Sequence, residues 1–367
     1  MNFRLRELRK LLAKNDLDAI LVSSLSNIVY LTNFSEFSTL DRDAYLLITK
    51  TKQYIFTHGI YKEAVEKQVP HFELRAIKRE TPITKTIRTI IEEQSITRLG
   101  FEAFDLKITE YEQLTKQINK KILIPTDMVN KIRIVKSPDE TEKIHKACAL
   151  GDKAFTFILK KMKPGITEKA LAFELEFYIK NRGADISFPP IVAFDANASQ
   201  PHHVPTNVKL KRNSLVLFDF GVKLDNYCSD MTRTVFFGKV TKKQKIVYNT
   251  VLAAQQQAID FINEELKLKK ELKASDVDKR AREYTVSQEF PTMPHSLGHG
   301  IGIEVHEAPR LTSFSQETLT ECMVFSIEPG IYLPEEFGVR IEDLFVVKND
   351  SLVQLTNAPK KLIELKI

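Results

Sequence analysis

The 367-residue sequence contains no tryptophan and only three cysteines, which lie far apart at Cys148, Cys228 and Cys322. An odd number of scattered cysteines, with no Cys-x-x-Cys pair, argues against a disulfide framework and against a zinc knuckle, and it fits a reducing compartment best. Runs of about 18 apolar residues are also missing, and the first ten residues lack the apolar stretch of a signal peptide. The sequence therefore predicts a cytoplasmic protein that does not enter a membrane.

A large net charge of either sign is missing as well. Lysine and arginine number 54 and aspartate and glutamate 48, so the net charge is only +6, and the excess is spread over short runs such as residues 209–212. Solvated surface is the simpler interpretation of these runs, because no basic stripe is interleaved with aromatic residues, and we expect no nucleic-acid partner. Hydrophobic residues make up 43% of the chain, which is enough for a sizeable core.

The chain is long enough for two domains. In the first, residues 1–130, helical and strand patterns alternate, beginning with leucines at positions 5, 8, 11 and 12 that form one apolar helix face. This pattern predicts an α/β (α+β) domain with a mixed sheet. The elements expected after the opening helix are strands over 18–22, 45–49, 54–57 and 99–102 and helices over 84–94 and 109–119.

A domain boundary is expected between Pro125 and Pro138. Ser137, followed by Pro138 and Glu140, is a typical helix start and should open a second domain over residues 136–367. There, two helices followed by strands occur twice, which hints at a duplicated half-domain. The expected helices cover 138–162, 167–182, 242–265 and 275–290, and the expected strands cover 191–194, 215–220, 230–237, 323–328, 338–342 and 344–347.

Four acidic residues of the second domain stand beside or within apolar runs: Asp219, Asp230, Glu328 and Glu342. A carboxylate among apolar neighbours carries a desolvation cost unless it is paired or metal-bound. Asp230 follows Asp219 by 230 − 219 = 11 residues, beyond a turn at 223–226, and this spacing can bring two carboxylates together on adjacent antiparallel strands. One such acid alone could face water, but four of them favour a cation between like charges.

Histidines are concentrated near these acids. Residues 294–306 contain His295, His299 and His306 together with three glycines, and His202 follows Pro201. Four carboxylates and one imidazole suit two divalent ions such as Mn²⁺, Co²⁺ or Fe²⁺. Two ions about 3.5–4 Å apart can lower the pKa of a shared water and stabilise a tetrahedral intermediate.

These residues carry a resemblance to a known superfamily. The sequence resembles the "pita-bread" metallopeptidases, which include methionine aminopeptidase, prolidase, aminopeptidase P and creatinase, and within them it resembles the Xaa-Pro branch. Residues 1–130 are similar to the creatinase-type N-terminal domain. The motifs that carry the resemblance over 136–367 are residues 218–222, 227–234, 295–302, 327–330 and 338–343.

The resemblance implies a pseudo-twofold pita-bread catalytic domain with two divalent metal ions, manganese first and cobalt, iron or zinc as alternatives. Glu328 would also be the general base toward the attacking water. His202, His295 and His306 match the substrate and proton-shuttle histidines of the branch, and Arg340 matches an arginine that supports the site. The implied metal ligands are Asp219, Asp230, His299, Glu328 and Glu342.

The implied activity is release of the N-terminal residue from peptides with proline at the second position, by an Xaa-Pro aminopeptidase. A prolidase restricted to Xaa-Pro dipeptides is the alternative, because the sequence does not specify the loops that close the site beyond proline. Methionine aminopeptidase and a non-catalytic peptide-binding relative fit less well, since the N-terminal domain, His295, Arg340 and all five ligands are present. The resemblance also implies a homodimer.

Two positions depart from the pattern of the branch, which usually has glycine where Asn226 stands and a small residue where Asp195 stands. Neither is an implied ligand. They bear on turn geometry and pocket shape rather than on the metal chemistry.

Overall fold

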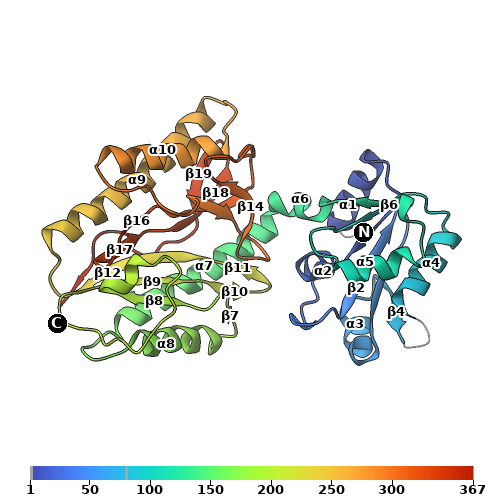
Figure 1. Cartoon of the computed structure of the whole chain (residues 1–367), viewed down its shortest axis with the longest axis horizontal. Helices are drawn as coiled ribbons and strands as arrows, with labels where there is room; N and C mark the ends of the chain where they lie inside the picture. Colours follow the sequence, from blue (N-terminus) through green and yellow to red (C-terminus); the bar gives the residue numbers. More distant parts are fainter. Residues whose placement is uncertain (1–2, 79–81, 367) are drawn as a thin grey trace. The chain divides into compact units, whose positions relative to one another are not determined.

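The computed structural model describes residues 3–78 and 82–366 (Figure 1). The chain divides into two compact units, Met1–Arg133 and Ile134–Ile367, and each unit is described by itself. Within the described ranges, none of the helices combines the length and apolar character needed to cross a bilayer.

The first unit is built on one six-stranded mixed sheet with the strand order β4-β3-β2-β1-β5-β6. Every residue of β1 (Ala19–Val22) is buried, as expected for a short apolar run, and the strand pairs antiparallel with β2 and parallel with β5. The other strands are β2 (Ala44–Thr49), β3 (Gln53–His58), β4 (Glu73–Ile77), β5 (Leu99–Phe101) and β6 (Leu123–Pro125). The helices are α1 (Phe3–Lys14), α2 (Leu25–Thr32), α3 (Lys62–Gln68), α4 (Ile83–Glu93), α5 (Ile108–Thr115) and α6 (Met128–Ile134).

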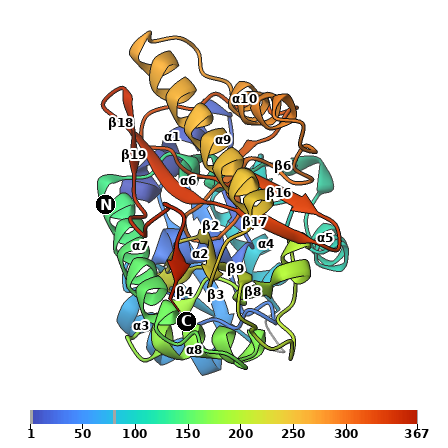
Figure 2. The ribbon, with the colours of Figure 1, turned by 90° about the vertical axis from the view of Figure 1, so that its left-hand side faces the viewer.

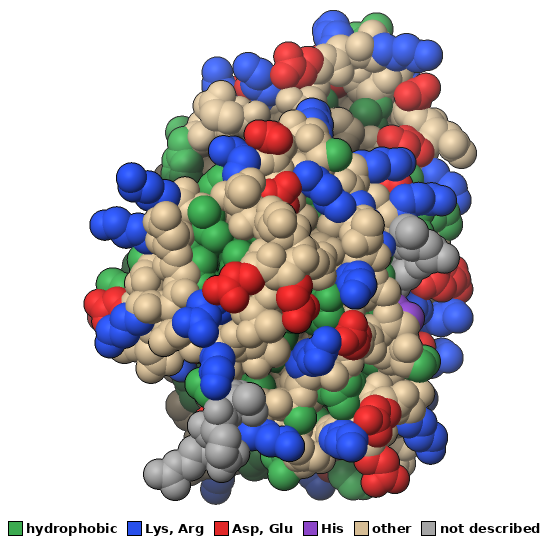
Figure 3. All heavy atoms as spheres, turned by 90° about the vertical axis from the view of Figure 1, so that its right-hand side faces the viewer, with side chains coloured by type: hydrophobic (Ala, Val, Ile, Leu, Met, Phe, Trp, Pro, Cys, Tyr) green, Lys and Arg blue, Asp and Glu red, His purple; other side chains and the backbone are tan. Residues whose placement is uncertain are grey.

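Charges on this unit are mixed. On the face drawn in Figure 3, lysine and arginine side chains are interspersed with aspartate and glutamate, in line with the dispersed charge of the sequence.

The second unit repeats the order of two helices followed by a sheet. Its first half contains α7 and α8 and the sheet β20-β12-β9-β8, and its second half contains α9 and α10 and the sheet β14-β13-β15-β18-β19. In Figures 1 and 2, α9 and α10 lie on one side of the strands and α8 lies on the other. This is the expected pseudo-twofold pita-bread arrangement. The helices are α7 (Pro138–Leu159), α8 (Glu168–Lys180), α9 (Lys242–Lys267) and α10 (Ala274–Ser287).

The strands of the first half are β7 (Asp185–Ile186), β8 (Ile191–Phe194), β9 (Ser214–Phe220), β10 (Val222–Leu224), β11 (Tyr227–Cys228) and β12 (Met231–Phe237). Those of the second half are β13 (Gly298–Gly300), β14 (Glu307–Leu311), β15 (Val324–Ile327), β16 (Gly330–Leu333), β17 (Phe337–Arg340), β18 (Asp343–Lys348) and β19 (Ser351–Gln354). The last strand, β20 (Glu364–Leu365), pairs with β12 in the sheet of the first half.

The predicted start of α7 is confirmed by its hydrogen bonds. Ser137 Oγ accepts from the Glu140 N–H at 3.3 Å, and the Ser137 N–H donates to Glu140 Oε2 at 2.9 Å, which together form a capping box. The helix ends at Leu159, earlier than expected.

Asp219 and Asp230 lie at one end of the adjacent antiparallel strands β9 and β12, as expected, and the register partner of Asp219 in β12 is Thr232. The connection between the two strands is not a simple turn, because residues 222–228 form a hairpin of their own that pairs with β7. One expectation about the acids needs correction. Glu342 does not lie within a strand, because β17 ends at Arg340 and β18 begins at Asp343 in a different sheet. Glu342 therefore lies in the short link between two strands of different sheets.

Candidate metal centre and active site

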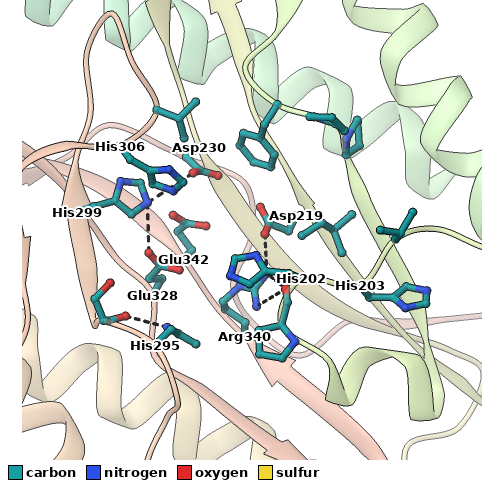
Figure 4. A pocket seen from close by; sticks show the side chains of 18 of the residues that line it. His202, His203, Asp219, Asp230, His295, His299, His306, Glu328, Arg340 and Glu342 are labelled. Atoms are coloured by element: carbon teal, nitrogen blue, oxygen red, sulfur yellow. Dashed lines mark hydrogen bonds and ion pairs between the residues drawn. The ribbon is translucent and has the colours of Figure 1, made fainter. Parts of the chain in front are cut away.

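The five expected metal ligands line one cavity of about 520 Å³ in the second unit (Figure 4). Each acid lies within or at the end of a strand that buried apolar residues hold in place. The residues are Asp219 in β9, Asp230 just before β12, His299 in β13, Glu328 just after β15 and Glu342 between β17 and β18. Both halves of the unit therefore contribute to one site.

The side chains of these residues approach closely. His299 Nε2 lies 3.3 Å from Glu328 Oε1 and 3.7 Å from Asp230 Oδ2. Ligand atoms of Asp230, His299 and Glu342 all lie within 4.8 Å of one another. Glycines on either side of His299 allow this approach, since a Cβ on Gly298 would lie 1.9 Å from the Ser326 carbonyl oxygen and one on Gly300 would lie 2.1 Å from that of Ala308.

Three buried carboxylate oxygens of the site have no hydrogen-bond partner among the described residues: Asp219 Oδ1, Asp230 Oδ1 and Glu342 Oε1. Buried polar atoms normally have partners, so three such oxygens in one cavity fit a cation as their partner. A set of four carboxylates and one imidazole fits divalent cations that prefer oxygen and nitrogen ligands.

The pKa shifts agree with this interpretation. Burial raises the pKa of Asp230 and that of Glu342 well above the usual range, and the neighbouring carboxylates raise both further. Burial also raises the pKa of Glu328, but the hydrogen bond and charge of His299 outweigh it and bring that pKa to about 2. The acids therefore repel one another strongly unless cations lie between them.

Arg340 organises two of the acids. Its Nη2 donates to Asp219 Oδ2 at 2.5 Å and its Nε donates to Thr232 Oγ1 at 3.1 Å. The Thr232 hydroxyl in turn donates to Glu342 Oε2 at 2.8 Å. Thr232 was not among the expected site residues, although the two-residue period of a strand places it on the same face as Asp230.

Both ring nitrogens of His295 are engaged. Its Nδ1 lies 2.8 Å from the Ser296 carbonyl oxygen and therefore carries the hydrogen, so its Nε2 accepts from the Tyr332 hydroxyl, which lies 2.8 Å away. Arg340 Nη1 donates to that hydroxyl oxygen at 2.7 Å. Burial lowers the pKa of His295, which favours this neutral form. His295 is thus connected to Asp219 through Tyr332 and Arg340, and Tyr332 is a second residue that the sequence did not single out.

The other two histidines lie at the rim of the cavity. His202 and His306 are both exposed and both line the cavity. The ring of His306 meets that of His299 edge to face, with centroids 4.4 Å apart. Burial lowers the pKa of His306, and the charge of His299 lowers it further. Arg310, which was also not expected, lines the cavity on the same side, and its register partner across β13 and β14 is His299.

The side chain of Asp195 does not line the cavity and instead forms hydrogen bonds with β9. Its Oδ2 accepts from the Ser214 hydroxyl at 2.7 Å and its Oδ1 accepts from the Leu215 N–H at 2.8 Å. These bonds fix the start of β9, the strand that carries Asp219.

Comparisons with known proteins find relatives over both units of the chain. Residues 142–349 match the sequence model of Metallopeptidase family M24, and residues 4–135 match that of the Creatinase/Prolidase N-terminal domain. An uncharacterized peptidase of Bacillus subtilis is 36% identical, with 99% of this chain and 100% of that protein covered. A Pyrococcus horikoshii protein named Xaa-Pro dipeptidase is 32% identical, with 99% of both chains covered.

Solved structures give the same result. The Xaa-Pro dipeptidase from Bacillus anthracis superposes with a TM-score of 0.90 at 32% identity, covering 99% of each chain. The X-Pro aminopeptidase from Thermotoga maritima gives 0.85 at 28% identity, covering 95% of this chain and 98% of that one. The expected fold, a creatinase-type N-terminal domain followed by a pita-bread domain, is confirmed.

Proposed function

Since this chain belongs to metallopeptidase family M24, we propose that it is a dinuclear Xaa-Pro peptidase, which hydrolyses the peptide bond before proline. The observation that carries the proposal is the convergence of four acids and one imidazole on a cavity where three buried carboxylate oxygens have no partner among the described residues. The similarity to proteins named Xaa-Pro dipeptidase and X-Pro aminopeptidase supports the preference for proline.

The metal site would contain two divalent ions, for which we propose manganese, with cobalt, iron or zinc as alternatives. Carboxylate-rich sites with one imidazole suit such ions, and affinity together with cellular supply selects among them. When bound, the ions would supply an activated water and stabilise oxyanion charge. The residues that would bind them are Asp219, Asp230, His299, Glu328 and Glu342.

The side chains of the cavity supply the proton transfers. Glu328 is ionised at neutral pH because of its low pKa, so it can accept a proton from the attacking water. His306, neutral because its pKa is lowered, can donate a ring N–H to the substrate oxygen on which charge develops. A prolyl nitrogen leaves as a secondary amine and needs a proton. His202, across the ligands from His306 in Figure 4, can relay to it the proton that Glu328 accepted from the water.

An apolar wall supports the preference for proline. Phe188, Pro189, Pro190 and Ile191 line the cavity. Such a wall suits the apolar pyrrolidine ring, while the polar groups opposite orient the peptide bond.

For substrate length, our first candidate is the Xaa-Pro aminopeptidase, which accepts peptides longer than two residues. His202, Val204 and His306 at the cavity rim are exposed, which leaves room for residues after proline. The second candidate is a prolidase restricted to dipeptides, and Arg310 favours it, because a guanidinium beside the cavity can pair with the carboxylate that ends a dipeptide.

Three further expectations from the sequence remain proposals. They are the domain limits at 1–130 and 136–367, the homodimer, and the cytoplasmic location.

Hydrolysis assays on metal-stripped protein resupplied with Mn²⁺ or Co²⁺ test the function. We expect cleavage of Ala-Pro and Ala-Pro-Ala but not of Ala-Ala, and we expect Asp230→Asn and Glu342→Gln to abolish cleavage and to lower bound metal. Two results distinguish the candidates. If the unsubstituted protein does not cleave Ala-Pro-Ala, the prolidase is favoured. If it does, and Arg310→Met loses cleavage of Ala-Pro but keeps cleavage of Ala-Pro-Ala, the aminopeptidase is favoured. Full activity of Asp230→Asn would overturn the site.

A further inference from the structure

The loop that carries His202 is packed against the N-terminal end of α8. The Lys169 N–H donates to the Thr206 carbonyl at 3.1 Å and the Glu168 N–H donates to the Val208 carbonyl at 3.3 Å. The loop after β8 therefore returns across the first turn of the helix before β9 begins.

Glu168, the first residue of α8, is fully buried at this crossing. A carboxylate without solvent needs several donors to remain ionised, although the N-terminus of a helix also favours a negative charge. Glu168 Oε1 accepts from the Phe194 N–H at 2.8 Å and from Asn197 Nδ2 at 2.9 Å. Glu168 Oε2 accepts from the Thr206 N–H at 2.8 Å, the Thr206 hydroxyl at 2.6 Å and His203 Nε2 at 2.9 Å.

All five donors come from the segment between the end of β8 and residue 206. They hold this segment at its two ends and at His203, the neighbour of His202. Between these points, Arg340 Nη1 and Nη2 donate to the Pro201 carbonyl oxygen, each at 3.4 Å. His202 and Val204, which line the cavity, are exposed and alternate in sequence with these fixed residues. Their positions over the cavity thus depend on bonds that they do not make themselves.

We propose that Glu168 is a positioning residue of the active site, which sets where His202 and Val204 lie over the cavity. The proposal rests on the proposed function, because it gives Glu168 an effect on peptide cleavage through His202. Glu168 does not line the cavity and touches neither the implied metal ligands nor the space for substrate.

An isosteric substitution tests this role sharply. Glu168→Gln keeps the volume of the side chain, but its NH₂ group would face N–H donors in either orientation: the Phe194 N–H at the position of Oε1, or the Thr206 N–H at that of Oε2. Glu174→Gln on the same helix is the matched control, since the side chain of Glu174 is half-exposed and pairs with Lys161 at 3.0 Å.

Two measurements are made on the full metal-loaded protein. Hydrogen exchange of residues 197–207 should become faster by about 10-fold or more in Glu168→Gln and not in Glu174→Gln, because local bonds set local protection. Cleavage of Ala-Pro should lose about 10- to 100-fold in kcat/KM with bound metal unchanged, as expected for a misplaced group. In a His202→Ala background the same Glu168→Gln change should lower kcat/KM by only about 2- to 3-fold, because the effects of coupled residues are not additive.

Unchanged hydrogen exchange in residues 197–207 of Glu168→Gln would overturn the proposal. So would a loss of kcat/KM from Glu168→Gln that is as large in the His202→Ala background as in the unsubstituted protein. Should Glu168→Gln fail to fold, Thr206→Val removes one of the five bonds, and a loss of kcat/KM that shrinks in the His202→Ala background supports the role, whereas an equal loss overturns it. Should the unsubstituted protein cleave no Xaa-Pro peptide, the proposed function fails, and exchange still decides whether Glu168 holds the loop.

Discussion

Arg340 binds one oxygen of Asp219, with Nη2 2.5 Å from Oδ2, while Oδ1 of the same carboxylate has no partner among the described residues. The carboxylate of Glu342 is bound in the same way. The Thr232 hydroxyl donates to its Oε2, and its Oε1 has no partner among the residues that the structure describes. One oxygen of each acid is thus used to orient the carboxylate, and the other is left for a cation. A site preorganised in this way does not have to rearrange when ions bind.

Arg340→Lys should lower kcat/KM for Ala-Pro by about 10²-fold, because an ammonium group cannot reach Asp219, Tyr332 and Thr232 together as the guanidinium does. Kinetics at saturating Mn²⁺ measure the effect, and the exposed Arg212→Lys is the matched control. Unchanged kinetics would show that the arginine does not orient Asp219.

The metal-free protein should lose stability relative to an Asp230→Asn variant as pH rises. The raised pKa of Asp230 means that the folded state holds its proton more tightly than the unfolded chain, whose carboxyl titrates near pH 4. Its stabilising contribution is therefore present below about pH 4 and is lost as pH rises toward the folded pKa. Melting temperatures of the two metal-free proteins between about pH 5 and 8 measure the effect. A constant difference across this range would contradict it.

His306→Ala should lower the cleavage rate by about 10²- to 10³-fold and leave bound metal largely intact, because the residue lies at the rim of the cavity and is not one of the five ligands. Cleavage assays and metal analysis by mass spectrometry on the same sample measure both quantities. His58→Ala, in the first unit, is the control. Loss of both ions would show that His306 binds metal rather than substrate.

The sequence alone pointed to the four acids and to the cluster of histidines that line the cavity, because an acid in an apolar run and a cluster of histidines are unusual in themselves. The choice of His299 as the implied ligand among these histidines came from the family resemblance. Thr232, Tyr332 and Glu168 were missed for the opposite reason. A threonine in a strand, a tyrosine in a strand and a glutamate at a helix start are all ordinary in their local context, and most of their contacts are made with residues far away in the chain.

In the fold, too, the features with a local sequence signal could be predicted, and those that depend on distant contacts could not. The start of α7 could be predicted because its cap lies within four residues. The strand β4 (Glu73–Ile77) was missed because it lies at the edge of its sheet and none of its five residues is buried, so it has no apolar run. The break between β17 and β18 at Glu342 was missed because it depends on which sheets the two strands join, and no local pattern encodes this.

A buried ion pair stabilises the loop that carries His306. Lys136 Nζ lies 3.2 Å from Glu307 Oε2, with side chains only 2% and 6% exposed. Lys136→Met should destabilise the protein by about 3–5 kcal/mol, because it removes the cation that faces a buried carboxylate. Adding Glu307→Leu should recover most of this loss, since an apolar pair of similar volume is often neutral. Urea unfolding of the three proteins measures the effect, and equal stability of Lys136→Met and the native protein would contradict it.

The turn at Asp225 and Asn226 explains why asparagine can stand where the Xaa-Pro branch usually has glycine. Both residues have positive φ, 48° and 71°, as a two-residue turn between β10 and β11 requires, and asparagine tolerates this conformation. Asn226→Gly should therefore change the free energy of unfolding by less than about 1 kcal/mol and leave kcat/KM unchanged. Asn226→Val should cost about 1–2 kcal/mol, because a β-branched side chain is strained at positive φ. Urea unfolding separates the two variants, and equal stability of both would mean that the turn does not need positive φ in solution.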